Sequence, residues 1–162
     1  MSAIETEVFT HAKPDFAERL AKLAGTIAGM ALTPGSGSTG SLPDAHALAA
    51  ALAMARRGAR DIGPEIAAAI YCGTDLWRPR IVAELVSAWM QTVRVARKYP
   101  KTLPLVAGHA YIAAVHAHPA EWREDLGMIR PVYTMLVSLG ESMLLRAADD
   151  CVLRAARHYY RV

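Results

Sequence analysis

Residues 78–98 read RPRIVAELVSAWMQTVRVARK and carry the clearest helical pattern in the chain. At about 100° per residue, a helix gathers the apolar side chains of this segment into one wide arc. The arc consists of Ile81, Val82, Leu85, Val86, Trp89, Met90 and Val93. An arc of that width suits a helix that packs against more than one neighbour. We therefore expect this segment to be the central helix of the core, ending before Pro100.

The same segment ends in a basic turn. Arg94, Arg97 and Lys98 are expected to fill the last turn of the helix. The negative end of the helix dipole favours cations there. The segment thus combines a wide apolar face with a basic end.

Apolar residues at spacings of three and four predict further helices on both sides of this segment. The expected ranges are 14–32, 45–57, 64–72, 104–116, a short helix opened by Pro119 and closed by Gly127, and 131–159. Within the last range, Gly140 is expected to permit close packing or a kink. The early core face expected there is Val132, Met135, Leu136, Leu139 and Met143.

Small polar residues and glycines are expected to mark the helix ends. Thr102 is a predicted N-cap, and Thr74 or Asp75 is predicted to cap the approach to the central helix. Gly58 and Gly73 are predicted to stop the helices that precede them.

The overall pattern predicts an all-α protein. No segment alternates apolar and polar residues as a half-buried strand would, and no internal repeat is found. Much of the 53% hydrophobic content is Ala, which favours close-packed helices. We expect a single-domain, irregular or orthogonal bundle of about six to seven helices over residues 1–162. Residues 1–13 are expected to form an irregular arm, and the Gly/Ser-rich residues 33–41 a flexible loop.

The charge is mildly basic, at +3 with an isoelectric point near 9.0. It permits an anionic partner without requiring one, because a dedicated nucleic-acid binder usually carries a denser basic footprint. Glu5, Glu7 and His11 stand where a signal peptide needs a basic end and an apolar run. The longest apolar run, 105–117, is too short to span a bilayer. A cytoplasmic protein without a membrane partner is expected.

Cysteine and histidine spacing gives little indication of a metal or redox centre. Cys72 and Cys151 form no CxxC or Cys/His motif, which favours two buried reduced thiols over a disulfide or a metal site. His109, His116 and His118 lie close together, and three imidazoles can bind zinc. They lack the spacing of known zinc motifs, so core or surface histidines are favoured. No metal and no cofactor is predicted.

No familiar catalytic pattern is found either. Asp149 and Asp150 are adjacent, so on a helix they point about 100° apart. Glu121, Glu124 and Asp125 suit a solvated acidic face. No serine lies in a GxSxG context and there is no GxGxxG. A hydrolase or metal enzyme built on the histidine region is the weakest hypothesis.

Basic residues near the C-terminus give the best functional indication. One helix face is expected to carry, at spacings of four, four, three and four, Arg146, Asp150, Arg154, Arg157 and Arg161. Asp150 would neutralise part of this face. Basic residues with aromatic neighbours, here His158, Tyr159 and Tyr160, can follow a phosphate backbone and stack bases.

Two further basic sets occur earlier in the chain. They are Arg94, Arg97, Lys98 and Lys101, and Arg56, Arg57 and Arg60. If the sets converge in space they make a nucleic-acid footprint, and if they scatter they are ordinary solubilising charge.

Two functional hypotheses follow. The first is a non-enzymatic helical module that contacts DNA or RNA backbone, within a larger assembly, through Arg94, Arg97, Lys98, Arg146, Arg154, Arg157 and Arg161. The second is a protein-interaction or homo-oligomeric protein, suggested by seven Met residues and the wide apolar arc. Size, helical content and basic patches are similar to those of small helical nucleoprotein subunits and small phage or mobile-element proteins, an analogy of fold class only.

Overall fold

The structure, a computed structural model, describes residues 15–22 and 43–160. Every regular element in these ranges is a helix, which confirms the all-α class. The expected arm at 1–13, the expected loop at 33–41 and Arg161 lie outside the described residues. Most of the expected helix 14–32 also lies outside them, apart from a helical segment at 15–22.

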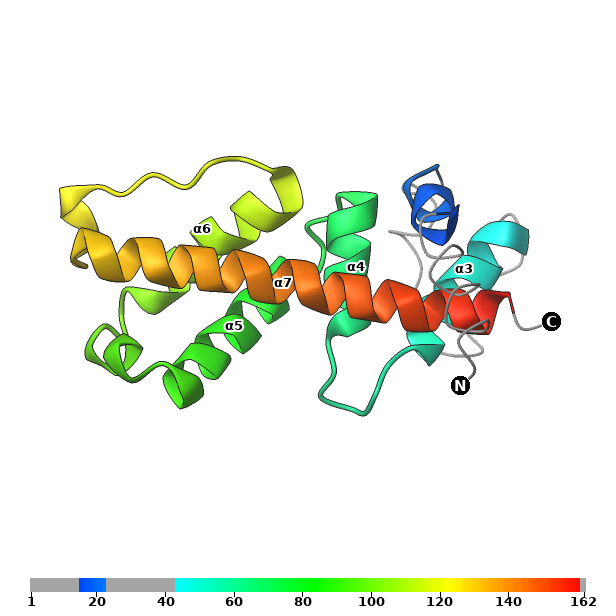
Figure 1. Cartoon of the computed structure of the whole chain (residues 1–162), viewed down its shortest axis with the longest axis horizontal. Helices are drawn as coiled ribbons and strands as arrows, with labels where there is room; N and C mark the ends of the chain where they lie inside the picture. Colours follow the sequence, from blue (N-terminus) through cyan, green and yellow to red (C-terminus); the bar gives the residue numbers. More distant parts are fainter. Residues whose placement is uncertain (1–14, 23–42, 161–162) are drawn as a thin grey trace, which may run out of the picture. The chain divides into compact units, whose positions relative to one another are not determined.

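In chain order the helices are α3 (Pro43–Met54), α4 (Gly63–Cys72), α5 (Arg78–Thr92), the 3-10 helix η1 (Arg94–Lys98), α6 (Leu103–His116), the 3-10 helix η2 (Glu124–Leu126) and α7 (Arg130–Tyr159). Short connections join most of the labelled helices, but a longer connection that contains only the short 3-10 helix η2 leads from α6 to α7 (Figure 1). The helices belong to two compact units: the second spans Leu76–Arg146, and the first includes α3, α4 and the end of α7 from Ala147. That the chain is a single domain stays a prediction.

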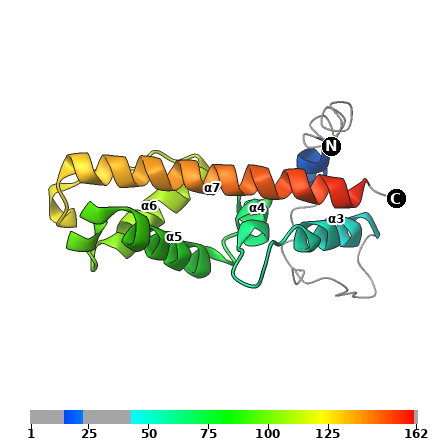
Figure 2. The same ribbon diagram turned by 60° about the horizontal axis from the view of Figure 1, so that its bottom comes forward.

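The second unit is built around α5, as the sequence predicted. Ile81, Leu85 and Trp89 of α5 are buried, and Trp89 is fully enclosed. Figures 1 and 2 both show α5 and α6 beside the N-terminal half of α7. The core of this unit therefore lies where these three helices meet.

Gly140 of α7 makes that meeting possible. A Cβ atom built at Gly140 would lie 2.7 Å from Cζ2 of Trp89 and 2.9 Å from Cβ of Ala110 in α6. Real Cβ atoms do not approach other atoms so closely, so only glycine fits here. The close packing expected at this glycine is confirmed.

The end of α5 differs from the expectation. The helix stops at Thr92, Val93 is extended (φ −112°, ψ 103°), and η1 follows as a separate 3-10 turn. Arg97 folds back from η1, and its Nε donates to the carbonyl of Met90 at 2.8 Å while Nη2 lies 3.5 Å from the carbonyl of Gln91. The cation at the C-terminus of α5 is therefore the guanidinium of Arg97, which belongs to η1 and not to the last turn of α5.

The buried face of α7 in the second unit is not the expected one. It consists of Tyr133, Leu136, Val137, Gly140 and Leu144. Of the expected face only Leu136 is buried, whereas Met135 and Leu139 are 42% and 37% exposed. Val132 and Met143 are partly buried. Apolar residues occupy much of the circumference of this helix, and the close approach at Gly140 selects which side faces the core.

The connection between α6 and α7 also corrects the sequence reading. Pro119 opens no helix, and residues 117–123 are irregular, with only the short η2 before Gly127. Ala117 takes a left-handed conformation (φ 50°), which ends α6. His118 precedes a proline and is therefore disfavoured from helical geometry.

The predicted helix ends are confirmed in position at Gly73 and at Thr102, which is the N-cap of α6, and are wrong at the start of α5. Gly73 closes α4 in the left-handed conformation (φ 68°), as expected. Thr102 precedes α6 but makes no side-chain cap. The N-cap of α5 is Trp77, not Thr74 or Asp75, and it too gives no side-chain cap.

Polar contacts hold the first unit together near the end of α3. This helix ends short of the expected Arg57, so Arg56 is released to form a two-pronged ion pair with Glu65 of α4, with N–O distances of 2.8 and 3.1 Å. Glu65 is only 3% exposed. Arg154 of α7 donates to the carbonyl of Ala55 at 3.0 Å. A buried pair of this kind is costly to break, because the remaining charge would stay without a partner. Figure 2 shows α3 beside this end of α7.

The Gly140→Ala substitution tests the close approach of α7. Alanine favours the helix by about 1 kcal/mol, but at contacts of 2.7 and 2.9 Å overpacking against Trp89 and Ala110 is expected to cost about 2–3 kcal/mol, the upper part of the usual range. We expect a net loss of about 1–2 kcal/mol in the free energy of unfolding, measured in urea.

Gly108→Ala in α6 is the matched control, because its Cβ would meet only Nη2 of Arg78, at 3.8 Å. We expect it to stabilise the protein by about 0.5–1 kcal/mol. Equal stabilisation by both substitutions would show that the contact at Gly140 is not tight.

Candidate functional site

Two pockets in the second unit share the connection between α6 and α7. The larger, of about 420 Å³, is named here the α6–α7 pocket, and the smaller, of about 300 Å³, the histidine pocket. Both are lined by His118, Pro119 and Ala120. The histidine pocket adds His109, Ile112, Glu121 and Arg123.

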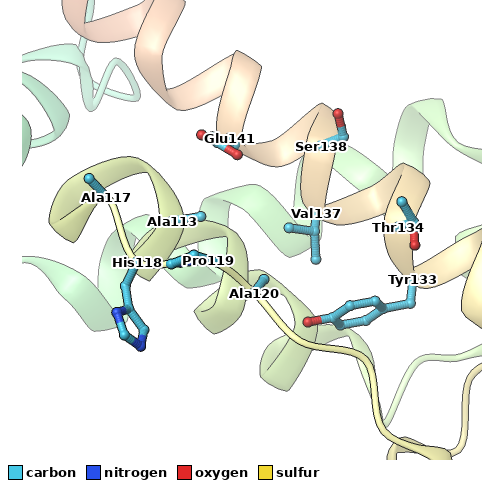
Figure 3. A pocket seen from close by; sticks show the side chains of 10 residues that line it. All are labelled: Ala113, Ala117, His118, Pro119, Ala120, Tyr133, Thr134, Val137, Ser138 and Glu141. Carbon is cyan, nitrogen blue, oxygen red and sulfur yellow. The ribbon is translucent and has the colours of Figure 1, made fainter.

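The α6–α7 pocket has an apolar part and a polar part (Figure 3). The apolar part comes from Ala113, Ala117, Pro119, Ala120 and Val137. The polar part comes from α7, through Tyr133, Thr134, Ser138 and Glu141. Figure 3 shows the imidazole of His118 pointing away from α7, so this residue lines the pocket without aiming its ring at it. Such a mixture of apolar lining with a few polar groups is typical of small-ligand sites.

The Tyr133 hydroxyl holds this region together. It donates to the backbone carbonyl of Glu121 at 3.1 Å and lies 2.7 Å from Nδ1 of His109. Because the hydroxyl has only one proton, His109 must be the donor in the second bond. In the neutral ring, Nε2 is then the unprotonated nitrogen. The bonds tie α6, the connection and α7 to one another.

The surroundings of His109 favour its neutral form. Burial, with a smaller contribution from the charge of Arg123, lowers the pKa of His109 below its ordinary value. Burial and the nearby Glu121 raise the pKa of Tyr133. A neutral imidazole in a pocket is a potential base, but the described residues place no serine, threonine or cysteine in the lining of the histidine pocket for it to activate.

Metal binding by the three histidines finds no geometric support. No group of three or more His, Cys, Asp or Glu side chains comes together in residues 15–22 and 43–160 as an ion site would require. His116 instead makes an edge-on ring contact with Tyr111, with centroids 6.3 Å apart.

Both cysteines are free thiols, but the prediction that both are buried holds only for Cys151. Cys151 is buried, and Cys72 is half-buried and lies 3.6 Å from the carbonyl oxygen of Leu20. Burial raises the pKa of Cys72 to about 11 and that of Cys151 to about 12. At neutral pH both are therefore poor nucleophiles.

The structure divides the predicted nucleic-acid residues between the two units. Arg94, Arg97, Lys98 and Arg146 belong to the second unit and are exposed. Arg154 and Arg157 belong to the first unit and are partly buried. The guanidinium of Arg154 is held by the carbonyl of Ala55 and lies 3.7 Å from Asp61. Arg161 lies outside the described residues.

Sequence reasoning missed the polar side of the α6–α7 pocket. Thr134, Ser138 and Glu141 follow one another at spacings of four and three, so they share one side of α7. That periodicity was visible in the sequence, but it resembles an ordinary solvated helix face. The contact between His109 and Tyr133 had no local signal, because the two residues lie on different helices.

Comparison with known proteins gives no family. The chain matches no protein-family model, no curated protein and no solved structure. Within the described part of the chain, no helix combines the length and the apolar character needed to cross a bilayer.

The pH dependence of stability tests the environment of His109. Because its pKa is lower in the folded protein, the unfolded chain binds more protons as the pH falls through the ordinary histidine range. Stability present at higher pH is therefore lost on acidification. An asparagine side chain at this position would keep an N–H donor for Tyr133 but would not titrate. We expect His109→Asn to lose less unfolding free energy than the parent between about pH 7.5 and about pH 5.5.

His118→Asn, at an exposed ring that points away from α7, is the control and should retain the parental pH dependence. An unchanged pH dependence in His109→Asn would contradict the assignment.

Proposed function

We propose that this chain is a non-enzymatic helical module that contacts the phosphate backbone of a nucleic acid, within a larger cytoplasmic assembly. The observation that carries the proposal is the basic turn at residues 94–101, RVARKYPK. Arg94, Lys98 and Lys101 are exposed there. The sequence contains no Asp or Glu from residue 85 to residue 120. The turn thus concentrates positive charge without local neutralisation.

The contacts of Arg97 support a preformed turn. Its two bonds to the last carbonyls of α5 fix η1 against the end of that helix. They also place a cation at the negative end of the α5 dipole. In the described residues no ion pair engages Arg94, Lys98 or Lys101. These cations are therefore available to an external anion.

The C-terminal residues support the proposal less directly. Arg146 is exposed, but Arg154 is engaged with Ala55 and Asp61, and Arg157 is partly buried. The basic turn is therefore the primary contact that we propose. Binding through a few phosphates is weak and strongly salt-dependent, which suits one subunit of a larger assembly better than an independent nucleic-acid binder.

Salt-dependent binding tests this proposal. Fluorescence anisotropy with a labelled DNA duplex and a labelled RNA hairpin, at several salt concentrations, gives the slope of log affinity against log salt. Removal of two phosphate contacts by the double substitution Arg94→Gln/Lys98→Gln is expected to lower the slope for B-DNA by up to about 1.8.

The matched control is Arg57→Gln/Arg60→Gln, which removes the same charge from exposed positions of the first unit. We expect the control to bind nearly as the parent does. Equal losses in both variants would mean a non-specific charge effect, and no binding by the parent at low salt would overturn the proposal.

One observation favours protein association as a second candidate. Met135 and Leu139 are exposed one turn apart on α7, and Val132 and Met143 lie along the same side. This apolar strip suits a contact with a second protein surface.

Sedimentation velocity over a range of concentrations tests the second candidate in its homo-oligomeric form. The parent is expected to associate as concentration rises, whereas Met135→Ser/Leu139→Ser should stay monomeric. The control Leu105→Ser/Ile129→Ser changes apolar residues that are 51% and 59% exposed elsewhere in the same unit, and it should associate as the parent does. A parent that is monomeric throughout would exclude self-association through the strip.

A further inference from the structure

We propose that the α6–α7 pocket binds a primary ammonium group carried on a short apolar chain. This site is separate from the basic turn, and it favours a ligand of the opposite charge to a nucleic acid. The proposal rests on the charge, the hydrogen-bonding groups and the apolar lining of one pocket.

The charges at the pocket favour a cation. Among the described residues that line the pocket, Glu141 is the only one with a carboxylate side chain, and no described residue forms an ion pair with it. Figure 3 shows its carboxylate extending from α7 on the side of the pocket where Ala117 ends α6. None of the lining residues that the structure describes is a lysine or an arginine. The same surroundings disfavour an anion.

The end of α6 adds to this negative potential. The helix has 14 residues, and its C-terminal turn reaches the pocket through Ala113 and Ala117. The dipole of a helix places partial negative charge on its last carbonyls, which favours a cation nearby. Ala117 is left-handed as a C-cap, but the described residues show no cap hydrogen bond from its N–H of the kind that Gly73 makes on α4.

The hydrogen-bonding groups match an ammonium ion. Such a group has three donors and no acceptor. The carboxylate of Glu141 is one acceptor, and the hydroxyl of Ser138, three residues earlier on the same side of α7, is a second. The hydroxyl of Thr134 belongs to a residue about 10.5 Å from Glu141 along the helix axis, so it lines the pocket without meeting the same ammonium group. A neutral ligand of the same shape would leave the carboxylate without a charged partner.

The apolar lining and the volume of the pocket determine which group can carry the ammonium. Alanine, proline and valine side chains face a pocket of about 420 Å³, which is at the small end of the range for ligand sites. The pocket therefore suits a short alkyl chain rather than a large ring system. Each added methylene that is buried should improve affinity about fourfold.

Isothermal titration calorimetry of the full chain with n-alkylammonium ions tests the site. We expect affinity to rise about fourfold per methylene from propyl to pentyl, and the alcohols of equal length to bind at least tenfold more weakly. No heat and no saturation with any of the amines would overturn the proposal, as would equal binding of amines and alcohols.

Glu141→Gln keeps the shape of the side chain and removes its charge. We expect it to weaken pentylammonium about tenfold or more, the loss that follows from a charge-assisted hydrogen bond. Glu124→Gln removes an exposed carboxylate outside the pocket lining and should bind as the parent does. An unchanged affinity in Glu141→Gln, with a melting temperature equal to that of the parent, would place the ligand elsewhere.

Should Glu141→Gln fail to fold, Ser138→Ala serves as the second variant, because its hydroxyl is exposed and its helix favours alanine. We expect a loss of about threefold to tenfold in affinity for pentylammonium, and no loss in this variant would contradict the proposed set of acceptors.

The ammonium could belong to a free amine or to a lysine side chain of a partner protein. Nα-acetyl-lysine methylamide carries the same alkylammonium with a bulky backbone. Binding as tight as that of pentylammonium supports the lysine source, and binding of pentylammonium alone supports the free amine. Neither result depends on nucleic-acid binding, so the two proposals succeed or fail separately.

Discussion

The second unit depends on the contact between the indole of Trp89 and the bare backbone of Gly140. The absence of a side chain at Gly140 lets α7 approach α5 and α6 closely enough for Trp89 to be fully enclosed. The indole Nε1 is buried and has no hydrogen-bond partner among the described residues, at a cost of about 1–3 kcal/mol. Burial of so large a ring must outweigh that cost, because the side chain alone removes a large apolar area from water. Close fit of the apolar surfaces therefore determines the packing at this contact, even though the indole N–H is left without a hydrogen bond.

The close contact of α7 with α5 and α6 at Gly140 also positions the α6–α7 pocket. Once Gly140 is fixed against Trp89, the next residue on α7, Glu141, is directed to the side of the helix that lines the α6–α7 pocket. Tyr133 lies nearly two turns before Gly140 on α7. Its hydroxyl bonds to the connection at the carbonyl of Glu121 and to α6 at Nδ1 of His109. The connection is therefore fixed at Glu121 by a hydrogen bond from Tyr133, and it begins at Ala117, whose left-handed conformation ends α6. Rigid helices on both sides with a short irregular segment between them are a common setting for binding sites.

The sequence predicted the features that depend on residues close together in the chain. The span of α7, the left-handed stop at Gly73 and the close packing at Gly140 were all apparent from periodicity and from glycine. The apolar periodicity predicted a single helix over 78–98, but the structure has α5 followed by the 3-10 helix η1, with extended Val93 between them. The pattern does not show this break, because a 3-10 helix repeats its side chains at nearly the same spacing as an α-helix. It also failed to choose between two apolar sides of α7, since that choice depends on a contact with Trp89. The Tyr133–His109 bond joins two helices and could not be read from either one.

The tryptophans and the cysteines of the chain lie in different units. Trp77, Trp89 and Trp122, the three tryptophans of the chain, all lie in the second unit, whereas Cys72 and Cys151 both lie in the first. The unmodified protein therefore contains a separate spectroscopic reporter for each half. Indole fluorescence follows opening of the second unit, and the rate at which the shielded thiols are alkylated follows opening of the first. Coincident transitions would identify one cooperative domain, and separate transitions would identify two, without any engineered label.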